Sequence, residues 1–191
     1  MKVNIGNTPY LYPIPIVLVG AQVNGKVNYV TVGDTGLMGI KPALVYISLN
    51  HNHFTTEGIF QTNTFSINIP TTAMLEKVDY CGVVSGRDVD KGSLFTNFYG
   101  ETNSAPMIEE CPVNLECRVI KEFAIQHRQV FIGEVVQTYI DDAMLQGEQA
   151  KKNVADMTKL KPILYALDNH YYSIGEIIGE GYQQAGKTIS K

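Results

Sequence analysis

The chain has 191 residues, of which 45% are hydrophobic and 18% are charged, and its formal net charge is −4. At about 150 residues per domain, this length indicates a single domain over residues 1–191, with a C-terminal tail from about residue 176. The apolar content argues against a disordered chain, and the mildly acidic balance argues against a nucleic-acid binder. The low share of charged residues suggests that a second subunit covers part of the surface.

The cysteines and the N-terminal segment predict a cytoplasmic protein. Cys81, Cys111 and Cys117 are odd in number and no pair has CxxC spacing, which argues against a disulfide framework or a zinc site. We expect free, buried thiols. The first residues lack the layout of a signal peptide, and the apolar run at 14–19 is too short to span a bilayer, so no membrane contact is expected.

Strand patterns dominate the first third of the chain. Residues 13–23 are rich in β-branched side chains, Asn24-Gly25 follows, and residues 27–32 form a second such run. Asn-Gly between two runs predicts a hairpin, because both residues tolerate a positive φ. Residues 43–49 are apolar on both faces, which predicts a strand in the interior of a sheet or barrel.

Two short helices are predicted next. Residues 55–63 favour a helix with a hydroxyl residue at its N-cap, since a hydroxyl oxygen can accept hydrogen bonds from the free amides of the first turn. Residues 64–69 alternate apolar and polar side chains, which predicts a half-buried strand that ends at Pro70. Residues 71–86 favour a second helix with Met74, Val78 and Cys81 on one face.

The second half of the chain predicts a further hairpin. Residues 87–112 look irregular, residues 113–119 alternate clearly, and His127-Arg128 separates them from a long strand at 129–140. Residues 141–161 predict a loop or short helix, and 163–166 and 171–174 predict short closing strands. Many strands with few short helices favour a mainly β, closed antiparallel barrel over a parallel sheet, which would need long helices between its strands.

Familiar catalytic and nucleotide-binding motifs are missing. Residues 33–39 are glycine-rich after a strand, but they do not form GxGxxG and no helix follows them. Neither a phosphate-loop GK[ST] nor a GxSxG elbow occurs. His51-Asn52-His53 has no third metal ligand nearby, so loop histidines near an anion are a better interpretation than a metal site.

Three polar segments are candidate binding sites, and each has a plain structural alternative. Residues 48–56 gather hydroxyls, amides and imidazoles before a helix N-terminus, which suits a phosphate, although capping of the helix is the simpler explanation. Residues 28–35 suit a flat ligand or an ordinary solvent-facing strand. In residues 85–91, Arg87 and Lys91 can approach an anion, or they can form a solvated helix end with local ion pairs.

The order of several segments resembles the flavin reductase-like family, especially its flavoredoxin branch. The resemblance covers roughly residues 10–175, and the relatives often have an arginine where this chain has Asn50 and two histidines. The segments that carry it are Pro15–Val19, Asn28–Thr31, Ser48–Thr55, Phe65–Pro70, Cys81-Gly82, Ser85–Lys91, Glu110–Arg118, Phe131–Val136 and Tyr171–Gly175.

The resemblance implies an antiparallel, Greek-key-like split β-barrel that binds FMN, with FAD less expected, usually as a homodimer with the flavin near the subunit interface. It implies that the strand after the first hairpin faces the isoalloxazine ring and that the polar loop holds the phosphate. Two interpretations of Tyr171 and Tyr172 stay open: closing residues around the flavin, or residues packed in the core. The cofactor-binding residues that it implies are Asn28, Val30, Thr31, Val32, Ser48, Leu49, Asn50, His53, Thr55, Thr56 and Lys91.

The function implied by the resemblance is that of an oxidoreductase whose flavin accepts hydride from NAD(P)H and passes electrons on. Backbone N–H groups near Thr31 and Val32 are expected to contact the pyrimidine edge of the flavin. No catalytic side chain is expected, because the flavin performs the redox chemistry itself. Two alternatives stay open: an FMN-binding electron carrier that a partner protein reduces, and a dimeric relative that has lost its flavin.

Overall fold

The computed structural model describes residues 1–145, 151 and 154–181. The predicted loop at 141–161 and the predicted tail therefore lie partly outside the described residues. The helical elements are η1 (Thr72–Met74), η2 (Gly92–Leu94), η3 (Asp142–Met144), α1 (Phe54–Thr62), α2 (Leu75–Val83) and α4 (Met157–Leu160). The strands are β1 (Ile14–Pro15), β2 (Val17–Val23), β3 (Lys26–Val32), β4 (Thr35–Gly39), β5 (Leu44–Asn50), β6 (Thr64–Ile69), β7 (Asn97–Phe98), β8 (Met107–Ile108), β9 (Val113–Ile125), β10 (Arg128–Ile140), β11 (Ile163–Tyr165) and β12 (Tyr171–Ser173).

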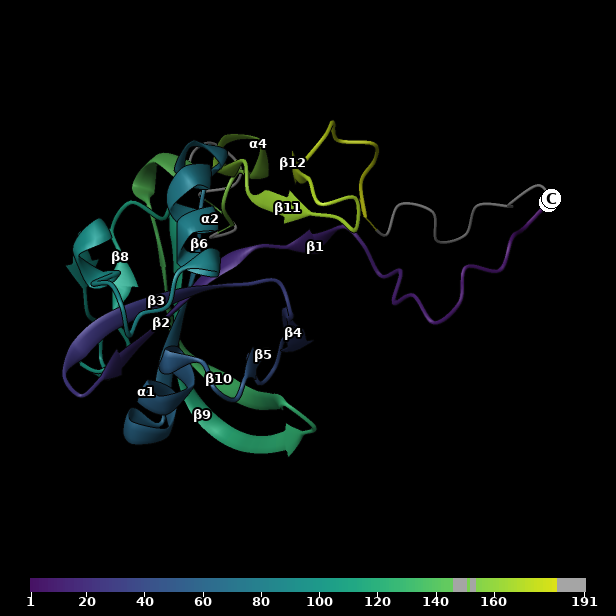
Figure 1. The fold of residues 1–191 in the computed structure, drawn as a ribbon. Helices are drawn as coiled ribbons and strands as arrows, with labels where there is room; N and C mark the ends of the chain where they lie inside the picture. The colour runs from purple at the N-terminus through teal and green to yellow at the C-terminus, as the bar shows by residue number, and fades with distance from the viewer. Residues whose placement is uncertain (146–150, 152–153, 182–191) are drawn as a thin grey trace.

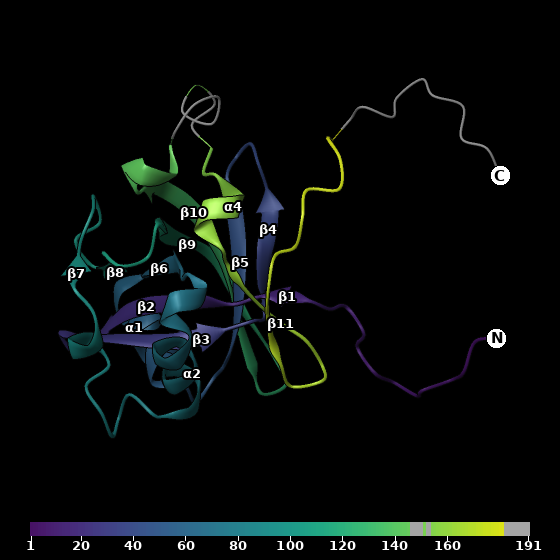
Figure 2. The ribbon, with the colours of Figure 1, turned by 90° about the horizontal axis from the view of Figure 1, so that it is seen from above.

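A seven-stranded sheet in the order β3-β2-β6-β9-β10-β5-β4 forms the body of the protein (Figure 1). Every pairing in it is antiparallel. The sheet curls until side chains of β3 and β5, which are far apart in the strand order, belong to one buried cluster. A small sheet of β1, β11 and β12 lies beside it, seen from above in Figure 2. The mainly β, barrel-like fold is as predicted.

Both predicted hairpins are present. Asn24 and Gly25 join β2 to β3 with φ values of 51° and 79°, the left-handed pair that a tight hairpin turn requires. β9 and β10 run for 13 residues each and turn at residues 126–127. β5 pairs with β10 on one side and β4 on the other, so its predicted place inside the sheet is confirmed.

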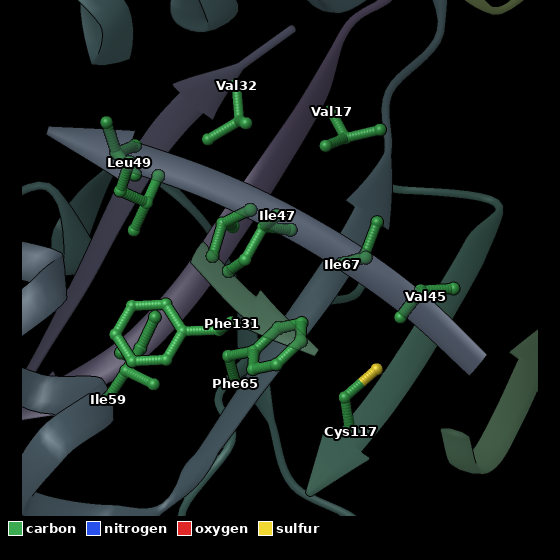
Figure 3. Packing of buried hydrophobic residues seen from close by; sticks show 13 residues of the cluster. Val17, Val32, Val45, Ile47, Leu49, Ile59, Phe65, Ile67, Cys117 and Phe131 are labelled. Atoms are coloured by element: carbon green, nitrogen blue, oxygen red, sulfur yellow. The ribbon is translucent and has the colours of Figure 1, made fainter. Parts of the chain in front are cut away.

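The main core fills the inside of the curled sheet. Phe65, Phe131 and Ile47 come from three strands and are fully buried there, as Figure 3 shows. Ile59 of α1 closes one end of this cluster. A second cluster lies on the outer face of β2 and β3, where Leu18 and Tyr29 pack against Val78 and Cys81 of α2. The β2-β3 hairpin is therefore held between α1 and α2.

Three local predictions need correction. β6 is almost fully buried rather than half-buried, because it lies between β2 and β9 at the centre of the sheet. α2 is shorter than residues 71–86, because residues 72–74 form a 3₁₀ turn and Val84 is extended. β4 was not predicted as a strand, and its Leu37 and Met38 are exposed, so it carries no inward apolar pattern.

Other predictions agree with the structure. All three cysteines are free and buried. β11 and β12 form near the predicted closing strands, and between residues 87 and 112 only short elements occur in the structure. Among the residues that the structure describes, none of the helices has the length and apolar character to cross a membrane.

Candidate functional site

The chain turns sharply between β5 and α1. The His53 N–H and the Thr56 hydroxyl donate to the Asn50 carbonyl at 2.9 and 3.0 Å, and the Asn52 N–H donates to Asn50 Oδ1 at 3.0 Å. The residue at the N-cap is His53, and it makes no capping side-chain hydrogen bond. The predicted hydroxyl cap is wrong, because the helix begins at Phe54 and both threonines lie within its first turn, where their hydroxyls bond to Asn28 and to the Asn50 carbonyl. The first turn of α1 therefore lacks a side-chain cap, which suits an anion.

His53 has a buried nitrogen without a partner. Its Nδ1 is inaccessible to solvent and has no hydrogen-bond partner among the described residues. Burial lowers the pKa of His53, and the nearby positive charges of Arg128, Lys91 and Arg87 lower it further. The start of α1 is therefore a positive environment, in which Glu57 pairs with Arg87 and Asp34 pairs with Arg128.

Lys91 is buried rather than solvated. Its side chain is enclosed, its Nζ donates to the Cys81 carbonyl at 2.8 Å, and burial lowers its pKa. The interpretation of residues 85–91 as a solvated helix end is thus wrong for Lys91. A buried ammonium with one backbone partner has further donors to offer a ligand.

Arg87 forms an ion pair, but with a distant residue rather than with a local one as predicted. Its guanidinium pairs with the Glu57 carboxylate and donates to the Asn52 carbonyl at 3.0 Å. The guanidinium also lies 5.3 Å from the centre of the Phe54 ring. These contacts hold the 85–91 segment against the start of α1.

A buried hydrogen bond joins β3 to α1. Asn28 Nδ2 donates to Thr55 Oγ1 at 2.7 Å. The backbone at Gly86 approaches the same amide so closely that a Cβ there would lie 1.9 Å from Asn28 Oδ1. Only glycine fits at this position, because any side chain would displace Asn28. Three segments that are distant in sequence therefore meet at Asn28.

These segments enclose a cavity of about 190 Å³. It lies between the start of α1, β3 and the segment from Cys81 to Lys91. Five of the eleven predicted cofactor-binding residues line it: Asn28, Val30, His53, Thr55 and Lys91.

The other six predicted residues do not line this cavity. Leu49 and Val32 belong to the main core, and the Thr31 hydroxyl donates to the Val78 carbonyl of α2. Thr56 is buried against Asn50, whose side chain is used within the turn. Ser48 lies on β5 two residues before Asn50, and its hydroxyl accepts a hydrogen bond from Arg128.

Sequence reasoning missed the role of Arg128. Its Nε donates to Ser48 Oγ at 3.1 Å, one Nη donates to the Ser48 carbonyl at 2.5 Å, and the guanidinium pairs with the Asp34 carboxylate. Arg128 opens β10 directly opposite Asn50. The β5-β10 register brings this arginine from a distant strand to the end of β5, which no local sequence pattern indicates.

Two larger cavities adjoin the small one. A cavity of about 440 Å³ shares Gly82 and Val83 with it and extends past Gly33 and Asp34 to the β11-β12 hairpin. A cavity of about 570 Å³ shares Phe54, Gly86 and Arg87 with it. Ligand sites usually measure about 300–1,000 Å³, so a phosphate-bearing cofactor held in the small cavity must extend into a neighbour.

Tyr171 forms part of the wall of the 440 Å³ cavity. Its hydroxyl donates to Asp79 Oδ1 at 2.7 Å, and its ring lies 5.4 Å from that of Tyr165. Burial raises the pKa of Tyr171 to about 12, and the Asp79 contact adds to the rise, so the phenol stays neutral. Tyr172 is exposed and bonds to Asp168 outside this cavity. Across the described ranges of the chain, no cluster of three or more metal-binding side chains occurs.

The lowered pKa of His53 predicts a pH-dependent stability. Below the ordinary histidine pKa of about 6.5, the unfolded chain binds a proton that the folded chain refuses. The free energy of unfolding should therefore fall as the pH drops from about 6.5 toward the lower pKa of the folded protein. At pH values above about 6.5, His53 should have no effect on it. Urea unfolding at about pH 7.5 and pH 5 tests this.

His53→Gln should reduce the loss of stability between these two pH values, whereas His127→Gln, at an exposed turn, should not. An unchanged loss in the His53 variant would show that His53 is not held neutral by its surroundings.

Comparisons with known proteins identify the family and the fold. The family model described as a flavin reductase like domain matches residues 10–175. Flavoredoxin from Methanosarcina acetivorans is 36% identical, with a TM-score of 0.91 over 97% of this chain and 98% of that chain. Flavoredoxin of Desulfovibrio vulgaris (Miyazaki F) is 30% identical, with a TM-score of 0.87 over 97% and 100%.

A more distant structure shares the fold. The FMN-binding protein from Thermus thermophilus is 22% identical, with a TM-score of 0.79 over 94% of this chain and 97% of that chain. An uncharacterized protein of Archaeoglobus fulgidus is 30% identical over 141 residues, which cover 73% of this chain and 79% of that protein. The chain belongs to the flavin reductase-like family.

Proposed function

We propose that the chain binds FMN and works as an NAD(P)H-dependent flavin oxidoreductase. Family membership supports a flavin-binding redox protein, and a relative of the same fold is named as FMN-binding. The observation that carries the proposal is the cavity at the start of α1, where His53, Arg87 and Lys91 meet a helix turn that has no side-chain cap.

The residues of the small cavity fit a phosphate monoester. Lys91 and Arg87 bring positive charge, His53 brings its imidazole ring, and α1 brings its first amide groups. A bound dianion would offset the mutual repulsion of these cations. A neutral His53 can donate one hydrogen bond to it from Nε2, since Nδ1 is enclosed by the protein.

The 440 Å³ cavity suits the isoalloxazine ring. Ile14, Ile16 and Tyr165 give it apolar walls, and Tyr171 closes it as a neutral phenol. In the described part of the sheet β3 pairs only with β2, so alternate backbone groups near Thr31 and Val32 point away from the sheet. These edge groups can contact the pyrimidine edge of a flavin.

The bound flavin would supply hydride acceptance and electron transfer. The protein's own part is to hold the phosphate, orient the ring and shield it from water. Lys91 anchors the end of α2 through the Cys81 carbonyl, and this anchor keeps Gly82 and Val83 in place between the two cavities.

Lys91→Met should weaken FMN binding more than riboflavin binding. A hydrogen bond to a charged group is worth about 1.5–3 kcal/mol, which corresponds to a roughly 10- to 100-fold higher Kd for FMN. Riboflavin lacks the phosphate, so its Kd should change much less. Fluorescence titration of the apoprotein with both ligands measures this difference.

Lys77→Met is the matched control, since Lys77 also donates to a backbone carbonyl, that of Leu94 at 2.7 Å, but does not line the small cavity. It should leave both Kd values close to wild type. Equal weakening of FMN and riboflavin by Lys91→Met would contradict a phosphate site beside Lys91.

Anaerobic mixing with NADH and NADPH tests the proposed electron donor. The flavin absorbance should bleach with at least one of them, because the nicotinamide can pass hydride to the flavin. Absence of bleaching with both would argue against the reductase, and bleaching by a redox protein alone would identify an electron carrier.

We also propose that the protein forms a homodimer. Leu37, Met38 and Ile40 are exposed at or beside the edge strand β4, and Ile120, Phe123 and Ile125 are exposed at the end of β9. Apolar side chains at an unpaired sheet edge are typical of an interaction surface. Light scattering at micromolar concentration should give the mass of two chains, and a monomer would contradict the proposal.

A further inference from the structure

Asp34 lines the 440 Å³ cavity but not the 190 Å³ one. It lies in the turn between β3 and β4 and lines the 440 Å³ cavity together with Gly33. Its carboxylate pairs with Arg128, and its carbonyl accepts from the Ser48 N–H at 2.8 Å. Arg128 in turn donates to the Ser48 hydroxyl and carbonyl. Both the backbone and the side chain of Asp34 are thus fixed to the end of β5.

The charges around the 440 Å³ cavity are acidic. Asp34 and Asp79 line it, whereas no lysine or arginine does so in the described ranges of the chain. The Asp79 carboxylate accepts from the Tyr171 hydroxyl, and Arg128 is the ion-pair partner of the Asp34 carboxylate among the described residues. Arg128 is turned toward Ser48 rather than into this cavity. The Asp34 side chain is 62% exposed, so its carboxylate is a partly solvated charge that this ion pair holds at the edge of the cavity.

We propose that Asp34 is a specificity-determining residue that lowers the affinity of the site for reduced FMN relative to oxidised FMN. This inference rests on the proposed function. Reduction adds electron density to the ring, and a fixed carboxylate disfavours that density more strongly once the ring excludes water. Arg128 keeps the carboxylate in position and partly offsets its charge. The residue would thereby make the protein a stronger reductant.

Asp34→Asn tests this inference with little change in shape. The variant removes the negative charge and releases Arg128, so the affinity for reduced FMN should rise about tenfold relative to oxidised FMN. For a two-electron couple this is a midpoint potential about 30 mV more positive. Redox titration gives the potential, and fluorescence titration gives the Kd of oxidised FMN.

Two further variants separate charge from structure. Asp34→Glu keeps the charge and should keep a potential close to wild type. Glu57→Gln removes the carboxylate that pairs with Arg87. Arg87 lines the small cavity but not the 440 Å³ cavity. The Glu57 variant should change the affinity for both redox states equally and leave the potential unchanged.

An unchanged potential in Asp34→Asn, with FMN still bound, would overturn the inference and leave the proposed function intact. An equal loss of affinity for both redox states would also overturn it and reduce Asp34 to a structural contact. A wild-type protein that binds no FMN would remove the proposed function, and this inference with it.

Discussion

The site depends on positive charge gathered at a helix start that lacks a side-chain cap. α1 begins at Phe54 without a side-chain cap, and the His53 ring beside it has a buried nitrogen with no partner among the described residues. Lys91 and Arg87 add cations from the segment after α2, and Arg128 adds one from β10. Glu57 and Asp34 pair with the two arginines, whereas Lys91 is buried with the Cys81 carbonyl as its hydrogen-bond partner. A buried charge is costly, because it loses its interaction with water, and a bound phosphate group would offset that cost at Lys91.

The topology explains how this charge is brought together. β3 is held between α1 and α2, so the hydrogen bond from Asn28 to Thr55 fixes the start of α1 against the sheet. Gly86 lets the segment after α2 approach the same point, and Lys91 ties that segment back to α2. Arg128 reaches the loop because β10 pairs with β5 in a register that places it opposite Asn50.

Local patterns predicted most of the fold. Asn24-Gly25 specifies its hairpin through its own backbone preferences, and the long alternation at 113–119 specifies β9 through its own side chains. β4 could not be found in this way, because its glycines and exposed apolar residues carry no alternation and its order comes from pairing with β5. The near-complete burial of β6 likewise depends on its neighbours.

The site was predicted only in part, because local patterns reveal polar segments but not their distant partners. His53, Thr55 and Lys91 were named from the polar segments and the family resemblance, and the structure brings them to one cavity. The burial of Lys91 and the contacts of Arg128 depend on partners from distant segments, the Cys81 carbonyl and Ser48, which no local pattern reveals.

A structure determined from crystals grown with excess FMN tests the central claim most directly. The account predicts phosphate oxygens within about 3 Å of a His53 ring nitrogen and of Lys91 Nζ, at the first turn of α1. A flavin bound with its phosphate elsewhere, or a small cavity filled by side chains in the presence of the cofactor, would contradict it.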